Sequence, residues 1–201
     1  MVAGHEWYLA SVGTERRDSV LRARNYPREC ERRASTRDGT EYLIRPIVPE
    51  DAEREIAFVR SLSAESRYRR LMYALREPSR DMVEPYVTVD YDRRMALVAL
   101  YGAPGREKII GVARYACDDD AAAHEFAVVV TDEWQGRGVG TKLLEALFEY
   151  ARAHGVRRLY GQVLQDNLPM LSLARKLGFS SGACPDDPQL VTVTLEMGAR
   201  Q

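Results

Sequence analysis

A glycine-rich stretch is the first place where this sequence could do chemistry. Residues 134–147 read WQGRGVGTKLLEAL, with glycines at positions 136, 138 and 140, between an apolar run and an amphipathic one. Glycine has no Cβ, so a ligand can approach its backbone closely. The N–H groups at the start of a helix lack intrahelical partners and lie at the positive end of the helix dipole. The stretch therefore predicts a phosphate-binding loop at the start of a helix over 138–154.

Two common phosphate-binding loops do not fit this stretch. A P-loop needs a glycine five positions before Gly140, which is absent, and Thr141 separates Gly140 from Lys142. The dinucleotide fingerprint needs a third glycine where Thr141 stands. The spacing therefore disfavours a nucleoside triphosphatase and a dinucleotide enzyme, and the pattern that fits is Q-x-x-G-x-G, starting at Gln135.

A carboxylate interrupts the apolar run HEFAVVV at residues 124–130. Alternate side chains of a strand share a face, so Glu125 and its neighbour His124 point in opposite directions. Glu125 could be an edge residue facing solvent or a partner of Arg114 on the neighbouring strand. It could also be a general base that removes a proton from an amine. The residues alone leave these interpretations open.

Apolar periodicity predicts the elements that position these residues. Strands are expected over 41–47, 95–102, 108–117, 124–130, 157–163 and 189–197, and helices over 48–62, 63–72, 79–87, 138–154 and 167–179. A Gly/Pro loop between the second and third strands indicates a hairpin. In the helix over 138–154, Leu143, Leu147 and Tyr150 form the inward face.

The length and the charge pattern indicate one domain with an N-terminal segment. Residues 1–40 are polar and rich in arginine, which is typical of a tail or extension, and residues 41–198 form the expected domain of the 201-residue chain. Lys and Arg number 29 against 30 Asp and Glu, so the net charge of -1 argues against a nucleic-acid binder or a protein of anionic membrane surfaces.

Three widely spaced cysteines predict neither a disulfide framework nor a metal site and suit a reducing cytoplasm. No apolar run is long enough for a membrane span, and the start of the sequence does not read as a secretory signal. The expected location is cytoplasmic, without a metal.

The loop from Gln135 to Gly140, between a strand and a helix, resembles the acetyl-CoA loop of the GNAT N-acetyltransferase superfamily. NLPMLSLARKLGF at 167–179 is similar to that family's N-x(11)-F helix and turn. The segments YLIRPIVPEDAE, SRYRRLM, DYDRRMALVAL and FAVVVTDEWQGRGVGTKLLEAL look closest to the GNAT domain of bacterial Pat-type protein lysine acetyltransferases. The resemblance implies an α/β (α+β) GNAT fold. It has a mixed, mostly antiparallel central sheet of six to seven strands, splayed in the middle, and about four flanking helices.

The resemblance also assigns residues to acetyl-CoA, the implied cosubstrate. Backbone groups of Val128, Val129 and Val130 would contact the pantetheine arm, and one N–H would polarise the thioester carbonyl. The predicted loop contacts to the pyrophosphate are Gln135, Gly136, Arg137, Gly138, Val139, Gly140 and Thr141. Asn167, which the sequence itself predicts as a helix cap, would also contact CoA.

In the family, the position of Glu125 holds the general base. A lysine-like amine with a pKa of ~10.4 must lose a proton before it attacks a thioester, so such a base is needed. Where many relatives have a tyrosine that protonates the departing thiolate, this sequence has Ala174. Either another group or water supplies that proton, or the site binds CoA without catalysis. Tyr115 and Tyr160 are candidate acids that the sequence does not rank.

The expected activity is transfer of acetyl from acetyl-CoA to a primary amine, with a protein lysine, for example in an acyl-CoA synthetase, as the acceptor. The partners are then acetyl-CoA and a protein substrate, without nucleic acid or membrane. A small-molecule amine acetyltransferase and a non-catalytic CoA-binding sensor are the alternatives. The acceptor rim, expected near 60–90 and 179–190, carries both signs of charge, which suits a protein surface.

Overall fold

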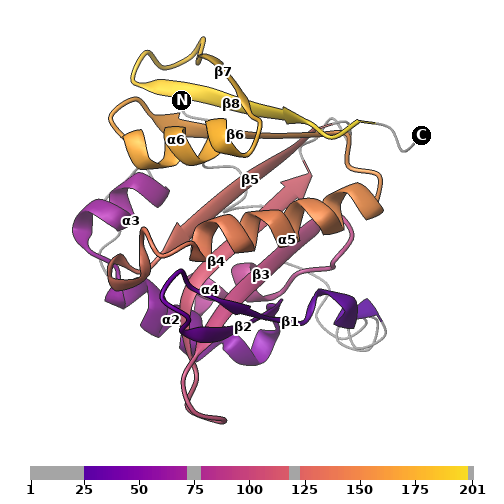
Figure 1. Ribbon diagram of the computed structural model, residues 1–201, viewed down its shortest axis with the longest axis vertical. Coiled ribbons are helices and arrows are strands. Elements are labelled where there is room, and N and C mark those ends of the chain that lie inside the picture. Colours follow the sequence, from indigo (N-terminus) through magenta and orange to yellow (C-terminus); the bar gives the residue numbers. More distant parts are fainter. Residues whose placement is uncertain (1–24, 72–77, 118–122, 199–201) are drawn as a thin grey trace.

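The computed structural model describes residues 25–71, 78–117 and 123–198 and is built around one eight-stranded sheet (Figure 1). The strand order is β1-β2-β3-β4-β5-β6-β8-β7. Every neighbouring pair of this sheet is antiparallel except β5 with β6, which is parallel. The predicted mixed, mostly antiparallel sheet is confirmed, with more strands than the six to seven expected.

The strands are β1 (Arg32–Ser35), β2 (Glu41–Pro46), β3 (Arg94–Tyr101), β4 (Lys108–Cys117), β5 (Ala123–Val130), β6 (Arg158–Leu164), β7 (Ser180–Ala183) and β8 (Leu190–Glu196). The six predicted strands correspond to β2 through β6 and to β8. The two additional strands, β1 and β7, are the two edges of the sheet. Because β1 pairs along β2, the sheet begins inside the stretch 1–40 that the sequence sets apart as a tail or extension. Residues 1–24 of that stretch lie outside the described residues.

The α-helices of the described residues are α2 (Ala52–Ser61), α3 (Ala64–Leu71), α4 (Arg80–Val87), α5 (Val139–Ala153) and α6 (Leu168–Lys176). These five correspond to the five helical stretches read from the periodicity, one more than the four or so that the resemblance implied. Serine hydroxyls cap two of these helices, since Ser63 Oγ accepts from the N–H of Ser66 and Ser79 Oγ accepts from that of Met82. None of these helices combines the length and the apolar composition that a membrane span requires.

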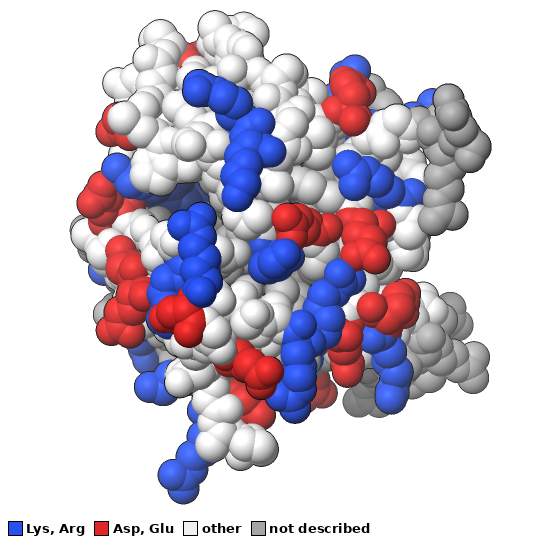
Figure 2. Space-filling model, viewed as in Figure 1, with Lys and Arg blue, Asp and Glu red and all other residues white. Residues whose placement is uncertain are grey.

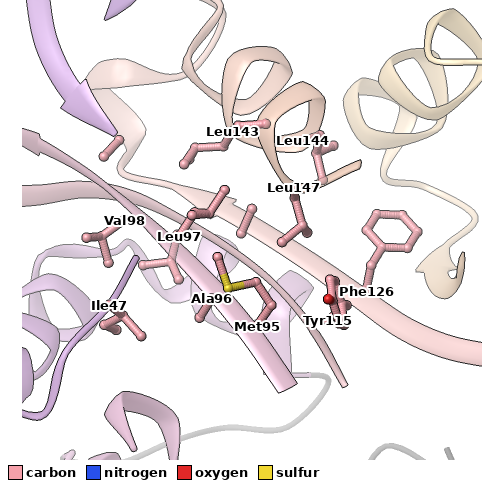
Figure 3. Close-up of a cluster of buried hydrophobic side chains, with 14 of the residues drawn as sticks. Ile47, Met95, Ala96, Leu97, Val98, Tyr115, Phe126, Leu143, Leu144 and Leu147 are labelled. Carbon is pink, nitrogen blue, oxygen red and sulfur yellow. The ribbon is translucent and has the colours of Figure 1, made fainter. Parts of the chain in front are cut away.

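The core lies on both faces of the sheet. Residues Met95 to Ala99 of β3 are all fully buried, so both faces of this strand are covered. Leu143, Leu144 and Leu147 of α5 point toward one face, as Figure 3 shows. On the opposite face, α2 and α4 pack together and α2 contacts β4. Packing of this apolar stripe thus fixes the position of α5 on the sheet. The glycine loop lies at the N-terminal end of this helix.

Replacing Leu147 by alanine should lower the free energy of unfolding by about 3 kcal/mol, because the side chain is completely buried and its removal leaves a cavity. Urea unfolding of the two proteins measures this difference. On the same helix, Glu149 forms only an exposed ion pair with Arg32, so Glu149→Ala should cost less than about 1 kcal/mol. Equal losses in the two variants would contradict the assignment of this face to the core.

Candidate functional site

Strands β5 and β6 pair at three positions and then separate. The pairs are Ala123 with Arg158, His124 with Leu159 and Glu125 with Tyr160. Both strands continue, β5 to Val130 and β6 to Leu164, without further pairing to each other. This opening, which we call the splay, confirms the split expected in the middle of the sheet. We call its closed end, at Glu125 and Tyr160, the apex.

The backbone of β5 alternates between the splay and β4. The carbonyl oxygen of Phe126 lies 3.2 Å from the position that a Cβ on Gly161 of β6 would take, so it faces the splay. The carbonyl oxygen of Val129 lies 3.3 Å from the corresponding position on Gly111 of β4, so it faces the other way. The N–H and C=O groups of a strand alternate sides residue by residue. Even-numbered residues of β5 therefore direct their backbone polar groups into the splay.

Val128 and Val130 are the valines whose backbones meet the splay. The Val130 carbonyl accepts a hydrogen bond from Gln135 Nε2 at 3.0 Å. The backbone of Val129, the third residue expected to contact pantetheine, is directed to β4, and its side chain lies on the same face as Glu125. The sequence could not make this distinction, because it depends on which neighbour each strand edge meets.

The glycine loop has the backbone that only glycine adopts without strain. Gly136 and Gly138 have φ values of +69° and +98°, and Gly138 is the N-cap of α5. A Cβ on either residue would meet no described atom within 4 Å. Gly140 lies inside the helix, where a Cβ would approach Val130 Cγ2 at 3.5 Å and Leu173 Cδ2 at 3.8 Å. The first two glycines thus leave space above the loop, whereas a Cβ at the third would make ordinary van der Waals contacts with β5 and α6.

Arg137 braces the loop against the turn between β1 and β2. Its Nη2 donates to Asp38 Oδ2 at 2.7 Å and to Thr40 Oγ1 at 3.1 Å, and its guanidinium lies 4.4 Å from the centre of the Trp134 ring. The N–H of Arg37 donates to the Arg137 carbonyl at 3.2 Å. The charge of Arg137 is therefore balanced by a carboxylate, and the turn holds the loop from outside.

The other basic side chain of the loop region is also ion-paired. Lys142 Nζ lies 2.9 Å from Glu145 Oε2. With both cations matched by carboxylates, the backbone N–H groups at the start of α5 are the donors that the loop offers to an anion. Thr141 is half-buried beside them, and Val139 is buried with its side chain in the core.

A second brace, which the sequence did not suggest, links the loop to α3. Asp132 accepts from the N–H and hydroxyl of Ser63 at 3.0 and 2.7 Å and from the hydroxyl of Ser66 at 2.9 Å. Gln135 Nε2 donates to Ser66 Oγ at 3.1 Å. Partial burial opposes the charge, but the hydrogen bonds from Ser63 and Ser66 hold the pKa of Asp132 below its usual value. Contacts across about seventy residues leave no local sequence signal.

Glu125 is half-buried at the apex, on the face of the sheet that α2 covers farther along. Arg114, which the sequence offered as a partner, donates to Glu55 Oε1 of α2 at 3.0 Å and to the Tyr86 carbonyl at 3.2 Å. Its guanidinium also lies 4.9 Å from the centre of the Tyr86 ring. The pair of Arg114 and Glu55 is buried, with 7% of each side chain exposed.

Arg70 of α3 joins this charge cluster. Burial and the neighbouring Arg114 lower the pKa of Arg70, and the electrostatic influence of Tyr86, Glu125 and Glu55 opposes that effect. Two guanidinium groups and two carboxylates therefore lie near one another on the face that carries Glu125. We call this group (Glu55, Arg70, Arg114 and Glu125) the charge cluster.

His124 is turned to the opposite face. Its ring packs edge-on against Tyr115 at 5.3 Å between centroids, and both residues are buried. Burial, together with the charge of Arg93, lowers the pKa of His124. Burial also raises the pKa of Tyr115 above its usual value. Neither side chain shares the face of Glu125.

Asn167 caps α6 as the sequence predicts, since its Oδ1 accepts from the N–H of Met170 at 3.2 Å. Farther along α6, Ala174 is buried. Among the residues that the structure describes, no group of three or more His, Cys, Asp and Glu side chains could hold a metal ion. The described site therefore consists of the splay, the glycine loop and the charge cluster.

Comparison with known proteins agrees with this geometry. The model of the acetyltransferase (GNAT) family matches residues 50–179. The chain is 35% identical over 150 residues to acetyltransferase PA5475 of Pseudomonas aeruginosa, covering 75% of this chain and 81% of that protein. It is 36% identical over 143 residues to acetyltransferase Pat of Mycolicibacterium smegmatis, covering 71% of this chain but 42% of Pat. The chain therefore matches less than half the length of that relative.

A solved structure gives the same result. The GNAT domain of S. lividans PAT superimposes with a TM-score of 0.77 at 29% identity, covering 86% of this chain and 99% of that one. The likeness extends over nearly the whole of that domain.

Gly138→Val should weaken CoA binding about 10-fold or more, because the new side chain enters the open space above the loop. Gly105, in the turn between β3 and β4, is a matched control: its φ is +78° and a Cβ there also meets no described atom within 4 Å. Both substitutions carry similar backbone strain. Calorimetry with CoA should show normal affinity for Gly105→Val. Equal CoA affinities in the two variants would show that the glycine loop does not contact CoA.

Proposed function

The chain belongs to the acetyltransferase (GNAT) family, and from this membership we propose that it transfers acetyl from acetyl-CoA to the side-chain amine of a protein lysine, with Glu125 as the general base. Membership makes it an acyl-CoA-dependent N-acetyltransferase. The observation that carries the proposal is the splay, which has a carboxylate at its apex, open backbone along one edge and a glycine loop at its mouth.

Acetyl-CoA fits this arrangement in three parts. The loop from Gly136 to Gly140 offers helix-start N–H groups to the pyrophosphate. The backbone groups of Val128 and the N–H of Val130 face the splay, where the pantetheine amides would lie, and the Val130 carbonyl is already bonded to Gln135. An N–H of this edge, that of Val128, would stabilise the oxyanion that forms when the thioester carbonyl is attacked, an effect typically worth about 3 kcal/mol.

Glu125 suits the role of base because of where it lies. A protonated lysine must lose a proton before it can attack, and a half-buried carboxylate at the apex can accept that proton directly or through water. The neighbouring His124, whose imidazole could also accept a proton, lies on the other face against Tyr115. Attack by the neutral amine on the carbonyl carbon then releases the CoA thiolate.

The acceptor is proposed from the charges on and around α3, the helix that contacts β5. Basic and acidic side chains are intermingled on the surface that contains α3 (Figure 2). Such a surface complements a protein that presents lysine among charges of both signs. The similarity to Pat-type proteins supports the same acceptor class. Residues 72–77, part of the expected acceptor rim, lie outside the described residues.

A small amine that also carries a carboxylate is the second candidate. Arg70 and Arg114 lie in the charge cluster with Glu125, and a guanidinium binds a carboxylate well. In that case Arg70 would hold the acid group of the acceptor while Glu125 takes the proton from its amine.

Incubation with acetyl-CoA and three acceptors separates these activities: an AMP-forming acyl-CoA synthetase, free L-lysine and spermidine. We expect thiol release that depends on the synthetase, and mass spectrometry should find the acetyl group on its active-site lysine. An unmodified synthetase beside rapid acetylation of a free amine would move the assignment to the small-molecule reaction. If none of the three acceptors increases thiol release, the result would favour a CoA-binding sensor without catalysis.

Glu125→Gln should lower kcat by about 100-fold or more while acetyl-CoA binds with near-normal affinity, because the amide keeps the shape but cannot accept a proton. The fall of kcat at acidic pH, which reports protonation of the Glu125 carboxylate, should disappear in this variant. The exposed Glu149→Gln on α5 serves as the control and should keep the wild-type rate. Retention of kcat by Glu125→Gln would place the base elsewhere.

A further inference from the structure

The geometry of the apex points to Tyr160 as the general acid that protonates the CoA thiolate as it leaves. The inference rests on the proposed transfer reaction and assigns a role that the family's usual position, occupied here by Ala174, cannot perform. It also favours Tyr160 over Tyr115 as the general acid, two candidates that the sequence left unranked.

The register places Tyr160 beside Glu125. The two residues are directly opposite each other in the last pair of β5 and β6 before the splay. Register partners on neighbouring strands lie on the same face of the sheet, about 4.8 Å apart, which is the spacing of the strands. Tyr160 therefore shares the face of the base and the closed end of the splay. The reacting end of a pantetheine arm that enters from the glycine loop has to reach this end.

The burial pattern of β6 shows that this face is accessible. Leu159, Gly161 and Val163 are buried, whereas Tyr160, Gln162 and Leu164 between them are half-buried. Gly161 contributes to the opposite face, where a Cβ would approach the ring of Phe126 at 3.0 Å. The phenol of Tyr160 thus lies on the partly open side of the sheet, where an acceptor also has to approach.

The other candidates lack this placement. Tyr115 is 1% exposed, and it packs against His124 on the face that α5 covers. Its hydroxyl is buried without a hydrogen-bond partner among the described residues. Ala174 is buried in α6 and has no proton to give. Of these three residues, Tyr160 alone combines an acidic proton with a position at the apex.

The proposed step balances as follows. The ammonium proton of the acceptor passes through Glu125 to water, which leaves a neutral amine and an ionised Glu125. The amine nitrogen then attacks the acetyl carbon, and Glu125 takes the second proton from that nitrogen. When the tetrahedral intermediate collapses, the C–S bond breaks and its electron pair stays on sulfur. Tyr160 gives its phenolic proton to that sulfur, forming the CoA thiol. The phenolate then recovers a proton from the protonated Glu125 beside it, so both side chains return to their starting states with the amide as product.

The ordinary acidities support this sequence of transfers. A phenol has a pKa of about 10 and a thiol such as that of cysteine about 8.5, so the transfer from phenol to thiolate alone is slightly unfavourable. A carboxylic acid with a pKa of about 4.3 reprotonates the phenolate readily. The adjacent positions of Glu125 and Tyr160 therefore make the complete proton circuit favourable.

The test compares Tyr160→Phe with Tyr115→Phe, using acetyl-CoA and whichever of the three acceptors above gives the fastest thiol release. Tyr160→Phe should lower kcat about 10- to 100-fold with KM for acetyl-CoA and CoA affinity unchanged. It should also abolish the alkaline fall of kcat, which reports ionisation of the acid. Tyr115→Phe removes a hydroxyl without a described partner and should keep kcat within about 2-fold.

A crystal structure of the protein with CoA gives an independent readout. The CoA sulfur should lie within about 3.5 Å of Tyr160 Oη, the range of a hydrogen bond to sulfur or slightly shorter. A sulfur on the face of Tyr115, or a Tyr160→Phe variant that keeps the wild-type kcat and alkaline limb, would overturn the inference while leaving the transferase proposal intact. Absence of transfer by the wild-type protein would overturn both.

Discussion

The central constraint on this molecule is that a sheet can leave backbone groups unpaired only where something else binds them. Buried N–H and C=O groups are almost always hydrogen-bonded. Strands β5 and β6 nevertheless separate after three pairs, and the half-buried residues of β5 beyond Phe126 direct every second set of polar groups into the opening. A substrate with amide groups of its own, such as the pantetheine arm of acetyl-CoA, would satisfy these groups and leave the site open. Continued pairing of β5 with β6 would close it.

The glycine loop depends on two braces that come from distant parts of the chain. On one side, Arg137 is held by Asp38 in the turn between β1 and β2. On the other, Gln135 is linked through Ser66 to the start of α3. A loop already held in its binding conformation loses less entropy when a ligand arrives. Pre-organisation of this kind suits a site in which glycine supplies space but no rigidity.

The sequence predicted most of the fold because long apolar periods are local signals. The strands β2 to β6 and β8 and the helix α5 were recognised from such periods. The four-residue edge strands were missed, since RRAS in β1 and SSGA in β7 show no apolar alternation and are formed by pairing with one neighbour. The motif identified the loop, but the partner of Arg137, the brace at Asp132 and the register of Tyr160 against Glu125 depend on tertiary contacts between residues far apart in sequence.

The three-pair junction between β5 and β6 also divides the sheet mechanically. Strands β1 to β5 form one continuously hydrogen-bonded ribbon, and β6, β8 and β7 form another. Local opening of a protein follows the places where few hydrogen bonds hold neighbouring units together. The three pairs between β5 and β6 are therefore the place where we expect the sheet to open first. A pantetheine arm held in the splay, as proposed above, would lie between the two ribbons and couple their unfolding.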